Sequence, residues 1–542
     1  MSDEDPPSGG GGRTPAERAG ATPLDPDRFK ANAGMPVVRR HRAEGADIVE
    51  PEAALDDTPV VRRARSASTR RRPRSAAPWF VGAAVLALIA LAAGALVVVN
   101  RPDTELAAGA PPASYASTPV LSARRVPEAL ARPVAARKLR EAVAPVLATA
   151  PPDTCLEVRD GGNVVVSHQA TTPLIPASNL KLLTADAALD VLGADTRLST
   201  RFVTDGAPTD GSVVRGNLYM VGGGDPLLTT GAYNSRLPNG KQPVTDMDDV
   251  ADQIAATGIT QITGSVVCDG SRYDAVRNTP SWPDRFFDQG QVARLSALLV
   301  DDAWRSTGGP ADDPDVHAAS VLTELLEDRG IEIGGAPTAG VAPAGAPLLT
   351  EVPSLTVAEL VAELLRFSDN TTAEMLVKEM GAQKGAGGST AAGLDVVRGW
   401  IESSGIPAEG VTFDDASGLS DADRATCSFL ATLLARGGPD GVVANGLAVP
   451  GQPGTLDDRF TGADLRDRVR GKTGTLRNAT GLSGWLTTRP SVPLAFSILT
   501  NTTGRQISAA DIELQGRLLT AMLDYPASPD LAALSPAPPT GV

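Results

Sequence analysis

Apolar and polar positions divide the 542-residue chain into stretches of different character. Residues 1–78 are rich in Pro, Gly, Ser, Asp and Arg and lack apolar periodicity long enough to build a core, so we expect a disordered tail. Residues 79–99 form an uncharged run of 21 residues, which as a helix spans about 30 Å, the thickness of the bilayer's hydrocarbon core. Residues 100–135 are rich in Pro and Ala and predict a linker. From residue 136 the pattern is that of a globular protein.

The uncharged run at 79–99 predicts a transmembrane anchor rather than a cleaved signal peptide. The apolar region of a signal peptide is about 7–15 residues long and lies near the N-terminus, whereas this run is longer and follows 78 residues. Its N-terminal flank is crowded with arginines, which are Arg62, Arg63, Arg65, Arg70, Arg71, Arg72 and Arg74. By the positive-inside rule, the tail is cytoplasmic and the chain after residue 100 lies outside the cell membrane.

Strand patterns and helix patterns are mixed in the globular part. Residues 155–169 alternate apolar and polar positions around Asp160-Gly161-Gly162, which is typical of a β-hairpin. Apolar residues at helical spacing follow Ser178 and end at Gly193. Further helices are predicted at 291–304, 317–330, 354–368 and 511–525, and further strands at 469–476, 481–488 and 493–500.

Residues 203–290 have a pattern of their own. Short strand-like runs are separated there by Gly, Asp and Pro, which predicts an inserted β-rich subdomain. The larger domain would then consist of two segments, 136–202 and 291–530. The last residues, 531–542, are expected to be flexible.

The charge of the chain is uneven and excludes one class of partner. There are 49 Lys and Arg against 64 Asp and Glu, a net charge of −15. Residues 1–79 hold 14 basic and 12 acidic residues, which leaves 35 against 52, a net charge of −17, for the rest. A body this acidic repels phosphate backbones, so we expect no nucleic-acid partner.

Three cysteines, Cys155, Cys268 and Cys427, allow at most one intramolecular disulfide. None stands in a C-x-x-C motif or beside a histidine, so neither a zinc site nor a thioredoxin-like motif is supported. For a body outside the cytoplasm we expect either a bridge between Cys155 and Cys268 or separate buried thiols.

The first motif that carries chemistry is Ser178-Asn179-Leu180-Lys181. Positions three apart share one face of a helix, so the Lys181 amine can reach the Ser178 hydroxyl. A serine hydroxyl is a weak nucleophile and needs a base beside it, and a lysine can be that base if its surroundings lower its pKa. Alone, Ser-x-x-Lys is a common string that usually marks a solvated helix start.

Two further motifs lie far along the chain. Ser368-Asp369-Asn370 ends a predicted helix, where a hydroxyl and a carboxamide two apart can face one cleft, although the string is usually a capping turn. Lys472-Thr473-Gly474 lies in a predicted strand and offers a cation, a hydroxyl and a close backbone approach to an anionic substrate.

Residues 471–473 also fit the end of a phosphate-binding loop, G-x-x-x-x-G-K-[ST]. That motif requires glycine at position 466, where this chain has Arg466. ATP is also not expected outside the cell, so we reject this interpretation.

The three motifs together are far more specific than any one alone. Their order, Ser-x-x-Lys, Ser-x-Asn, Lys-Thr-Gly, is the signature of penicillin-binding proteins and β-lactamases. Over residues 140–530 the chain resembles the class C low-molecular-mass penicillin-binding proteins, the D-Ala-D-Ala carboxypeptidase/endopeptidase family. Residues Gly222–Leu228 resemble the family's Gly-Asp-Pro segment, and Asp414–Ser420 resemble its DGSGLS stretch. The resemblance implies an α/β (α+β) penicillin-binding, β-lactamase-like transpeptidase fold with an inserted β-rich subdomain.

The resemblance also implies a serine DD-peptidase that acts on peptidoglycan stem peptides. Lys181 would take the proton from Ser178 as it attacks the carbonyl of the penultimate D-alanine. The backbone N–H groups of Ser178 and Thr475 would form the oxyanion hole. Ser368 would pass the proton to the leaving D-alanine, and Asn370 would hold the substrate amide. β-Lactam antibiotics would acylate the same serine, and no metal or cofactor is implied.

The strand motif and its neighbours are the expected substrate-binding residues. Lys472 and Thr473 would bind the terminal carboxylate, while Gly474 and Thr475 would lie against the substrate backbone. Leu476 is expected to touch the substrate.

Three further assignments follow from the resemblance. Arg477 is another candidate contact to the substrate. Residues Ser417 to Leu419 are expected to shape the floor of the cleft. Asp225 would either bind the amino group of a diaminopimelate side chain or form an Asp-Pro turn.

Several alternatives stay open. A β-lactamase or a related serine esterase or amidase would share the fold, and a non-catalytic cell-wall scaffold could retain it. A histidine-dependent serine hydrolase is disfavoured, because only His168 and His317 lie in the body and no serine has a G-x-S-x-G elbow. The sequence leaves the oligomeric state open.

Overall fold

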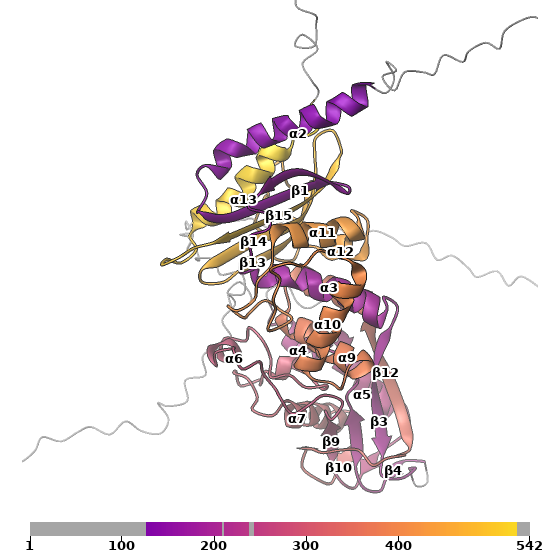
Figure 1. Ribbon diagram of the computed structural model, residues 1–542. Coiled ribbons are helices and arrows are strands. Elements are labelled where there is room, and N and C mark those ends of the chain that lie inside the picture. The colour runs from indigo at the N-terminus through magenta and orange to yellow at the C-terminus, as the bar shows by residue number, and fades with distance from the viewer. Residues whose placement is uncertain (1–125, 209–210, 238–242, 528–542) are drawn as a thin grey trace, which may run out of the picture. The chain divides into compact units, whose positions relative to one another are not determined.

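The computed structural model describes residues 126–208, 211–237 and 243–527 (Figure 1). The predicted tail 1–78, the predicted anchor 79–99 and the C-terminal segment 531–542 lie outside the described residues. The predicted linker 100–135 is too long, because its last ten residues, 126–135, are helical. Among the described residues, no helix is both long and apolar enough to cross a bilayer. The anchor therefore stays a prediction.

A five-stranded antiparallel sheet is the scaffold of the larger domain. Its order is β13-β14-β15-β1-β2. The strands are β1 (Asp153–Asp160), β2 (Asn163–His168), β13 (Val469–Thr475), β14 (Ala479–Thr487) and β15 (Pro493–Asn501). β1 pairs with β15 over its whole length, so the predicted N-terminal hairpin completes a sheet begun by the three C-terminal strands.

Helices cover both faces of this sheet (Figure 1). On one face lie α2 (Val126–Leu147) and α13 (Ala509–Met522). The other face carries a thicker layer of helices: α3 (Lys181–Leu192), α8 (Val357–Phe367), α9 (Asn370–Lys384), α10 (Thr390–Ser404), α11 (Cys427–Gly437) and α12 (Val442–Gly446). Successive side chains of β1 point to opposite faces of the sheet. Leu156 and Val158 pack in the core under α2 and α13, whereas Cys155 packs in the core formed with the thicker helical layer.

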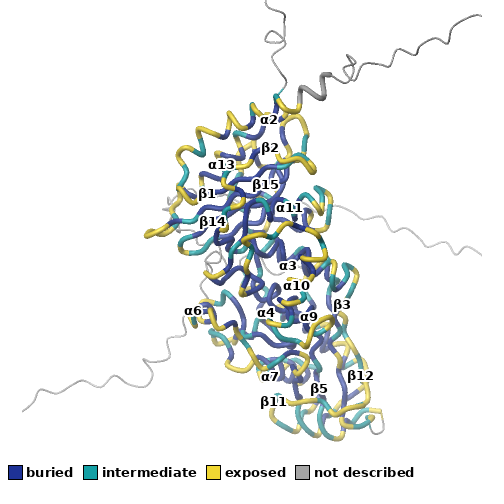
Figure 2. Tube along the Cα trace, in the orientation of Figure 1, coloured by how far each residue is buried: buried dark blue, intermediate teal, exposed yellow. Residues whose placement is uncertain are grey.

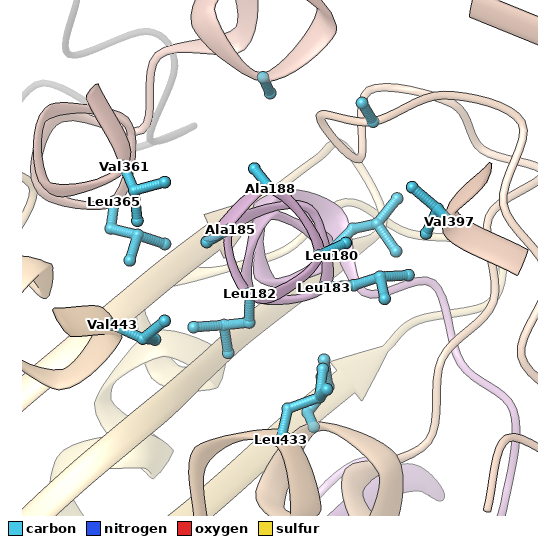
Figure 3. Close-up of a cluster of buried hydrophobic side chains, with 14 of the residues drawn as sticks. Leu180, Leu182, Leu183, Ala185, Ala188, Val361, Leu365, Val397, Leu433 and Val443 are labelled. Carbon is cyan, nitrogen blue, oxygen red and sulfur yellow. The ribbon is translucent and has the colours of Figure 1, made fainter. Parts of the chain in front are cut away.

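Helix α3 is enclosed by the other helices of its layer (Figure 3). Its apolar side chains point in several directions (Figure 3), and most of them are buried. The burial colours along the chain trace agree (Figure 2). Around it are Val361 and Leu365 of α8, Val397 of α10, Leu433 of α11 and Val443 of α12. A helix that is apolar on all sides has to be buried. This packing fixes the position of the residues at its N-terminus.

A second domain is built on another five-stranded sheet, with the order β11-β9-β5-β3-β12. The strands are β3 (Arg197–Thr204), β5 (Leu218–Val221), β9 (Val266–Asp269), β11 (Thr338–Ala339) and β12 (Leu348–Thr356). Helices α5 (Met247–Ala255) and α7 (Pro314–Glu327) pack on it. Because β3 and β12 belong to this sheet, the domain extends beyond the segment 203–290 expected from the sequence.

Shorter elements complete the second domain. A three-stranded sheet has the order β10-β8-β4, and a two-stranded one joins β6 to β7. Their bounds, with those of two single-turn helices, are β4 (Val213–Val214), β6 (Leu228–Thr229), β7 (Thr245–Asp246), β8 (Gln261–Ile262), β10 (Glu332–Ile333), α4 (Gly231–Asn234) and α6 (Arg285–Asp288).

The helix predicted at 291–304 is wrong. The segment is irregular except for one short 3-10 turn, η4 (Asp301–Ala303). Leu295, Ala297 and Leu299 pack into one hydrophobic cluster, whereas Leu298 and Val300 pack into the core of the second domain. The segment therefore runs between two cores and turns alternate side chains to each, which a helix could not do.

The bridge expected between Cys155 and Cys268 is also wrong. Cys155 on β1 is bonded to Cys427, the first residue of α11, with 6.0 Å between the Cα atoms and a sequence separation of 272. Cys268 is a buried free thiol in the core of the second domain. The two cysteines of the expected bridge thus belong to different cores.

Removing this disulfide should destabilise the protein. We expect the double substitution Cys155→Ala and Cys427→Ala to lower the free energy of unfolding by about 2–5 kcal/mol, because the cross-link closes a very long loop in the unfolded chain. Denaturant unfolding, followed with and without a reductant, measures this effect. Reductant should destabilise the wild type and the Cys268→Ala control but leave the double variant unchanged. A reductant-insensitive wild type would contradict the bridge.

Candidate active site

Ser178 and Lys181 meet at the start of the enclosed helix. Ser178 lies in a 3-10 turn, η3 (Ala177–Leu180), that continues directly into α3. The Lys181 amine is fully buried and donates to Ser178 Oγ at 3.0 Å, to Asn370 Oδ1 at 2.6 Å and to the Ser417 carbonyl at 2.6 Å. The spacing of three therefore brings the amine to the hydroxyl, as the sequence predicts.

The surroundings of Lys181 lower its pKa to about 8. Burial is the main cause, because the charged form loses its hydration. Nearby carboxyl groups, Asp415 first and then Glu374, oppose this shift. A lysine with a pKa near 8 has an appreciable unprotonated fraction at neutral pH, which a general base requires.

The Ser-Asp-Asn motif forms a tight junction between two helices. Ser368 ends α8 in the left-handed conformation, with φ of 63°, and Asp369 caps α9 by accepting from Thr372 N at 3.0 Å. This turn directs Ser368 and Asn370 to the same region. The Asn370 carboxamide accepts from Lys181 and donates to the Gln291 carbonyl at 2.7 Å, so both of its ends are held.

The Lys-Thr-Gly motif lies on the edge strand β13. The Lys472 amine is fully buried and donates to Ser368 Oγ at 2.8 Å and to the Thr473 carbonyl at 2.8 Å. Burial, followed by the nearby Lys181, lowers its pKa well below the usual lysine value. Residues 471–473 are paired in register with β14, so they do not form a phosphate-binding loop.

Gly474 allows β13 to lie directly against the turn that carries Ser178. A Cβ atom at position 474 would lie 2.7 Å from Asn179 Nδ2, 2.9 Å from Ser178 N and 3.0 Å from the Pro176 carbonyl. Only glycine permits this approach. It brings the backbone of the strand beside the backbone of the serine.

The three motifs converge on a cleft of about 1540 Å³. The predicted residues on its wall are Ser178, Asn370, Thr475, Leu476 and Arg477, with Leu419 from the expected floor. The others of the main set, Lys181, Ser368, Lys472, Thr473 and Gly474, lie buried in the layer behind this wall.

Asp225 is not brought to this cleft. Its side chain is 1% exposed and accepts from Leu227 N at 2.9 Å and from Thr245 Oγ1 at 2.6 Å. These contacts lie within the second domain and fix the Asp-Pro turn, which was the alternative interpretation of the residue.

Some residues of the cleft carry no signal in the sequence. A segment of the second domain supplies part of the wall through Ser281, Arg285 and Phe286, and the loop 502–507 supplies another part. Asp415, which organises the turn beneath Ser178, was signalled only by its place in the DDASGLS string. Neither His168 nor His317 lines the cleft, and the described ranges contain no group of His, Cys, Asp and Glu arranged to hold a metal ion.

The fold and the site together define a serine enzyme of the penicillin-binding and β-lactamase-like class. Residues 145–309 and 305–521 match the D-Ala-D-Ala carboxypeptidase 3 (S13) family. The chain belongs to this family, and it is therefore a serine-type peptidase.

Curated relatives and solved structures agree with this family. The chain is 27% identical to a D-alanyl-D-alanine carboxypeptidase of Actinomadura sp., over 63% of this chain and 76% of the relative. It is 31% identical to a carboxypeptidase of Mycobacterium tuberculosis, over 61% of this chain and 72% of the relative. Penicillin-binding protein 4 of Haemophilus influenzae has a similar fold, with a TM-score of 0.59 at 18% identity, covering 70% of this chain and 98% of that protein.

The close approach at Gly474 can be tested with one added methyl group. We expect Gly474→Ala to slow acylation by penicillin about 100-fold, because the new Cβ forces the strand away from Ser178 and misplaces the reacting groups. Stopped-flow or quench measurements of adduct formation give the rate. Gly399→Ala is the control: it lies exposed within α10 with open space around its Cβ, and it should leave the rate unchanged. Equal rates for both variants would contradict the packing argument.

Proposed function

We propose that this chain hydrolyses the terminal D-Ala-D-Ala bond of peptidoglycan stem peptides through an acyl-enzyme on Ser178. The observation that carries the proposal is the buried Lys181 amine, 3.0 Å from Ser178 Oγ on the wall of a large cleft. Membership of a family of D-Ala-D-Ala carboxypeptidases supports the choice of substrate. The family match also favours a peptidase over the alternatives, which are a β-lactamase, a related esterase or amidase, and a non-catalytic scaffold.

In the first step, unprotonated Lys181 takes the proton of the Ser178 hydroxyl. Serine Oγ then forms a bond to the carbonyl carbon of the penultimate D-alanine. The negative charge that develops on the carbonyl oxygen would be met by the backbone N–H groups of Ser178 and Thr475. The packing at Gly474 supports this pairing, because it places the strand backbone beside Ser178 N. Each such donor typically contributes about 3–4 kcal/mol to the transition state.

In the second step, the C–N bond breaks and the terminal D-alanine leaves with a proton. We assign this proton to the path through Ser368, whose hydroxyl is hydrogen-bonded to the Lys472 amine. The lowered pKa of Lys472 supports the assignment, since a lysine that is readily deprotonated can exchange a proton with its serine partner. Water then attacks the ester carbonyl, which frees the product and restores Ser178.

Substrate binding would be divided between the wall of the cleft and the layer behind it. Thr475 and Leu476 on the wall can contact the peptide directly, and Asn370 can hold its amide. Lys472 is fully buried, so we expect it to favour the terminal carboxylate through its charge, while Thr473, which is 6% exposed, would act beside it. Asp225 has no place in this proposal, because its carboxylate is occupied by a turn.

We also propose that the domains described here act outside the cytoplasm, held by the helix predicted at 79–99. The arginine-rich flank of that segment supports a cytoplasmic N-terminus. The disulfide between Cys155 and Cys427 supports the same location, because such bonds persist in oxidising compartments.

Labelled penicillin provides a direct test of the nucleophile. We expect the full-length protein to form a stable covalent adduct, and Ser178→Ala to abolish it, since among the described residues no other hydroxyl is hydrogen-bonded to the Lys181 amine. Mass spectrometry of digests locates the adduct, and incubation with defined muropeptides should release D-alanine from pentapeptide stems. Adduct formation by the Ala variant would assign the nucleophile elsewhere. Rapid turnover of penicillin without D-alanine release would favour a β-lactamase.

The same reaction should depend on pH through Lys181. The amine acts as a base only when unprotonated, so the acylation rate should rise as the pH passes through about 8 and then reach a plateau. Lys181→Ala should slow acylation by orders of magnitude without unfolding the protein, which circular dichroism can verify. Acylation that is insensitive to both the pH and this substitution would remove Lys181 as the base.

A further inference from the structure

A buried carboxylate organises the turn beneath Ser178. Asp415 has no exposed surface, and its two oxygens accept four hydrogen bonds. The donors are Ser417 N at 3.1 Å, Gly418 N at 2.7 Å, Ser420 N at 2.8 Å and Trp282 Nε1 at 2.9 Å. A carboxylate that accepts four N–H groups is arranged as an ionised acceptor. We refer to residues 415–420 as the Asp415 turn.

The Asp415 turn ends on the Lys181 amine. Its Ser417 carbonyl accepts from Lys181 at 2.6 Å, as closely as any other partner of that amine. The carbonyl can be aimed there only if the turn keeps its shape, and three of the four bonds to Asp415 come from the turn's own backbone. The turn requires glycine at position 418, where φ is 79° and a Cβ atom would lie 2.0 Å from the Ala177 carbonyl oxygen.

The turn is also fastened to the two helices that flank the site. Ala416 N donates to Glu374 Oε1 on α9 at 2.9 Å, and Thr184 Oγ1 on α3 donates to the Ala416 carbonyl at 2.6 Å. The position of the Ser417 carbonyl is thereby tied to both the helix that carries Lys181 and the helix that carries Asn370.

The charges that face Lys181 come from several elements. They are Glu374 on α9, Asp369 at its N-cap, Asp415 and Asp423 on the segment after α10, and Lys472 on β13. Burial, followed by the neighbouring Asp415, raises the pKa of Glu374 to about 8 and that of Asp423 to about 10. Those two carboxyl groups are therefore largely protonated at neutral pH. Asp415 instead has four N–H donors on its two oxygens, an arrangement that suits a negatively charged carboxylate.

We propose that Asp415 is a positioning residue for Lys181: it holds the Ser417 carbonyl on the lysine amine, and its charge is the buried counter-ion of that amine. This inference rests on the proposed function, in which Lys181 is the base for acylation. The Asp415 turn supplies one of the three acceptors that satisfy the fully buried Lys181 amine. Without the carboxylate, both the third acceptor and the balancing charge are lost.

The two parts of the proposal predict two separable effects. Loss of the negative charge stabilises the unprotonated amine, so the acidic limb of the acylation pH profile should move to lower pH. Loss of the turn's shape misplaces the amine, so the plateau rate at high pH should fall. A residue that only stabilised the fold would reduce the number of active molecules equally at every pH and move neither quantity per active site.

The test compares Asp415→Asn with Asp423→Asn in the full-length protein. Both are made in a Glu374→Gln background, so that Glu374 cannot ionise in place of Asp415. Acylation by penicillin is measured across pH, and rates are normalised by titrating active sites. Relative to the Glu374→Gln protein, Asp415→Asn should move the midpoint of the acidic limb of the acylation profile down by about one pH unit. It should also lower the plateau rate about tenfold. Asp423→Asn should leave the midpoint of the acylation profile as it is in the Glu374→Gln protein, because an amide replaces a carboxyl group that is already protonated.

An unchanged midpoint in Asp415→Asn would overturn the counter-ion part of the proposal. Trp282→Phe tests the positioning part without altering any charge, and it serves if the Asn variant does not fold. It removes one donor to Asp415, so the plateau should fall several-fold at an unchanged midpoint. A wild-type plateau in Trp282→Phe would overturn that part. Failure of the unmodified protein to form an adduct would instead refute the proposed function.

Discussion

The Lys181 amine is kept out of water, and this burial sets the demands that the surrounding elements meet. A buried ammonium group is costly unless its hydrogen bonds are satisfied and its charge is balanced. Here the acceptors come from parts of the chain that are far apart in sequence, namely Ser178, Asn370 and Ser417. Each element that supplies an acceptor has to be held within a fraction of an ångström. The enclosure of α3 by the other helices of its layer meets that demand, because a packed core moves little.

The second buried amine, Lys472, couples the sheet to this arrangement. It joins the edge strand β13 to the junction between α8 and α9 through the Ser368 hydroxyl. The strand is also pressed against the Ser178 turn at Gly474, so the sheet and the helical layer meet on both sides of the nucleophile. Two lysines whose pKa values are both lowered, each beside its own serine, would in the proposed mechanism provide one proton acceptor for bond formation and one proton path for the leaving group.

The sequence allowed the residues that meet at the cleft to be predicted because each motif is short and lies within one local element. Ser178 and Lys181 are neighbours on a helix, and Ser368 and Asn370 share one turn. The partner of Cys155 could not be predicted in this way, since it depends on which core each cysteine enters. The segment 291–304 has helical spacing but lies between two cores, and only the tertiary structure shows that. The role of Asp415 could not be predicted either. Its place in the DDASGLS string marks the segment, but only the structure shows the four N–H donors around its carboxylate and the Lys181 amine that the turn contacts.

The bond between Cys155 and Cys427 has a consequence for durability. It joins a strand that precedes the second domain to a helix that follows it, so the whole of that domain lies within a covalently closed loop. A protease that cut one of its exposed loops would produce two pieces that stay attached to each other. The half with the nucleophile and its amine could not drift away from the half with the edge strand. This linkage would keep the pocket assembled after a cut within the second domain.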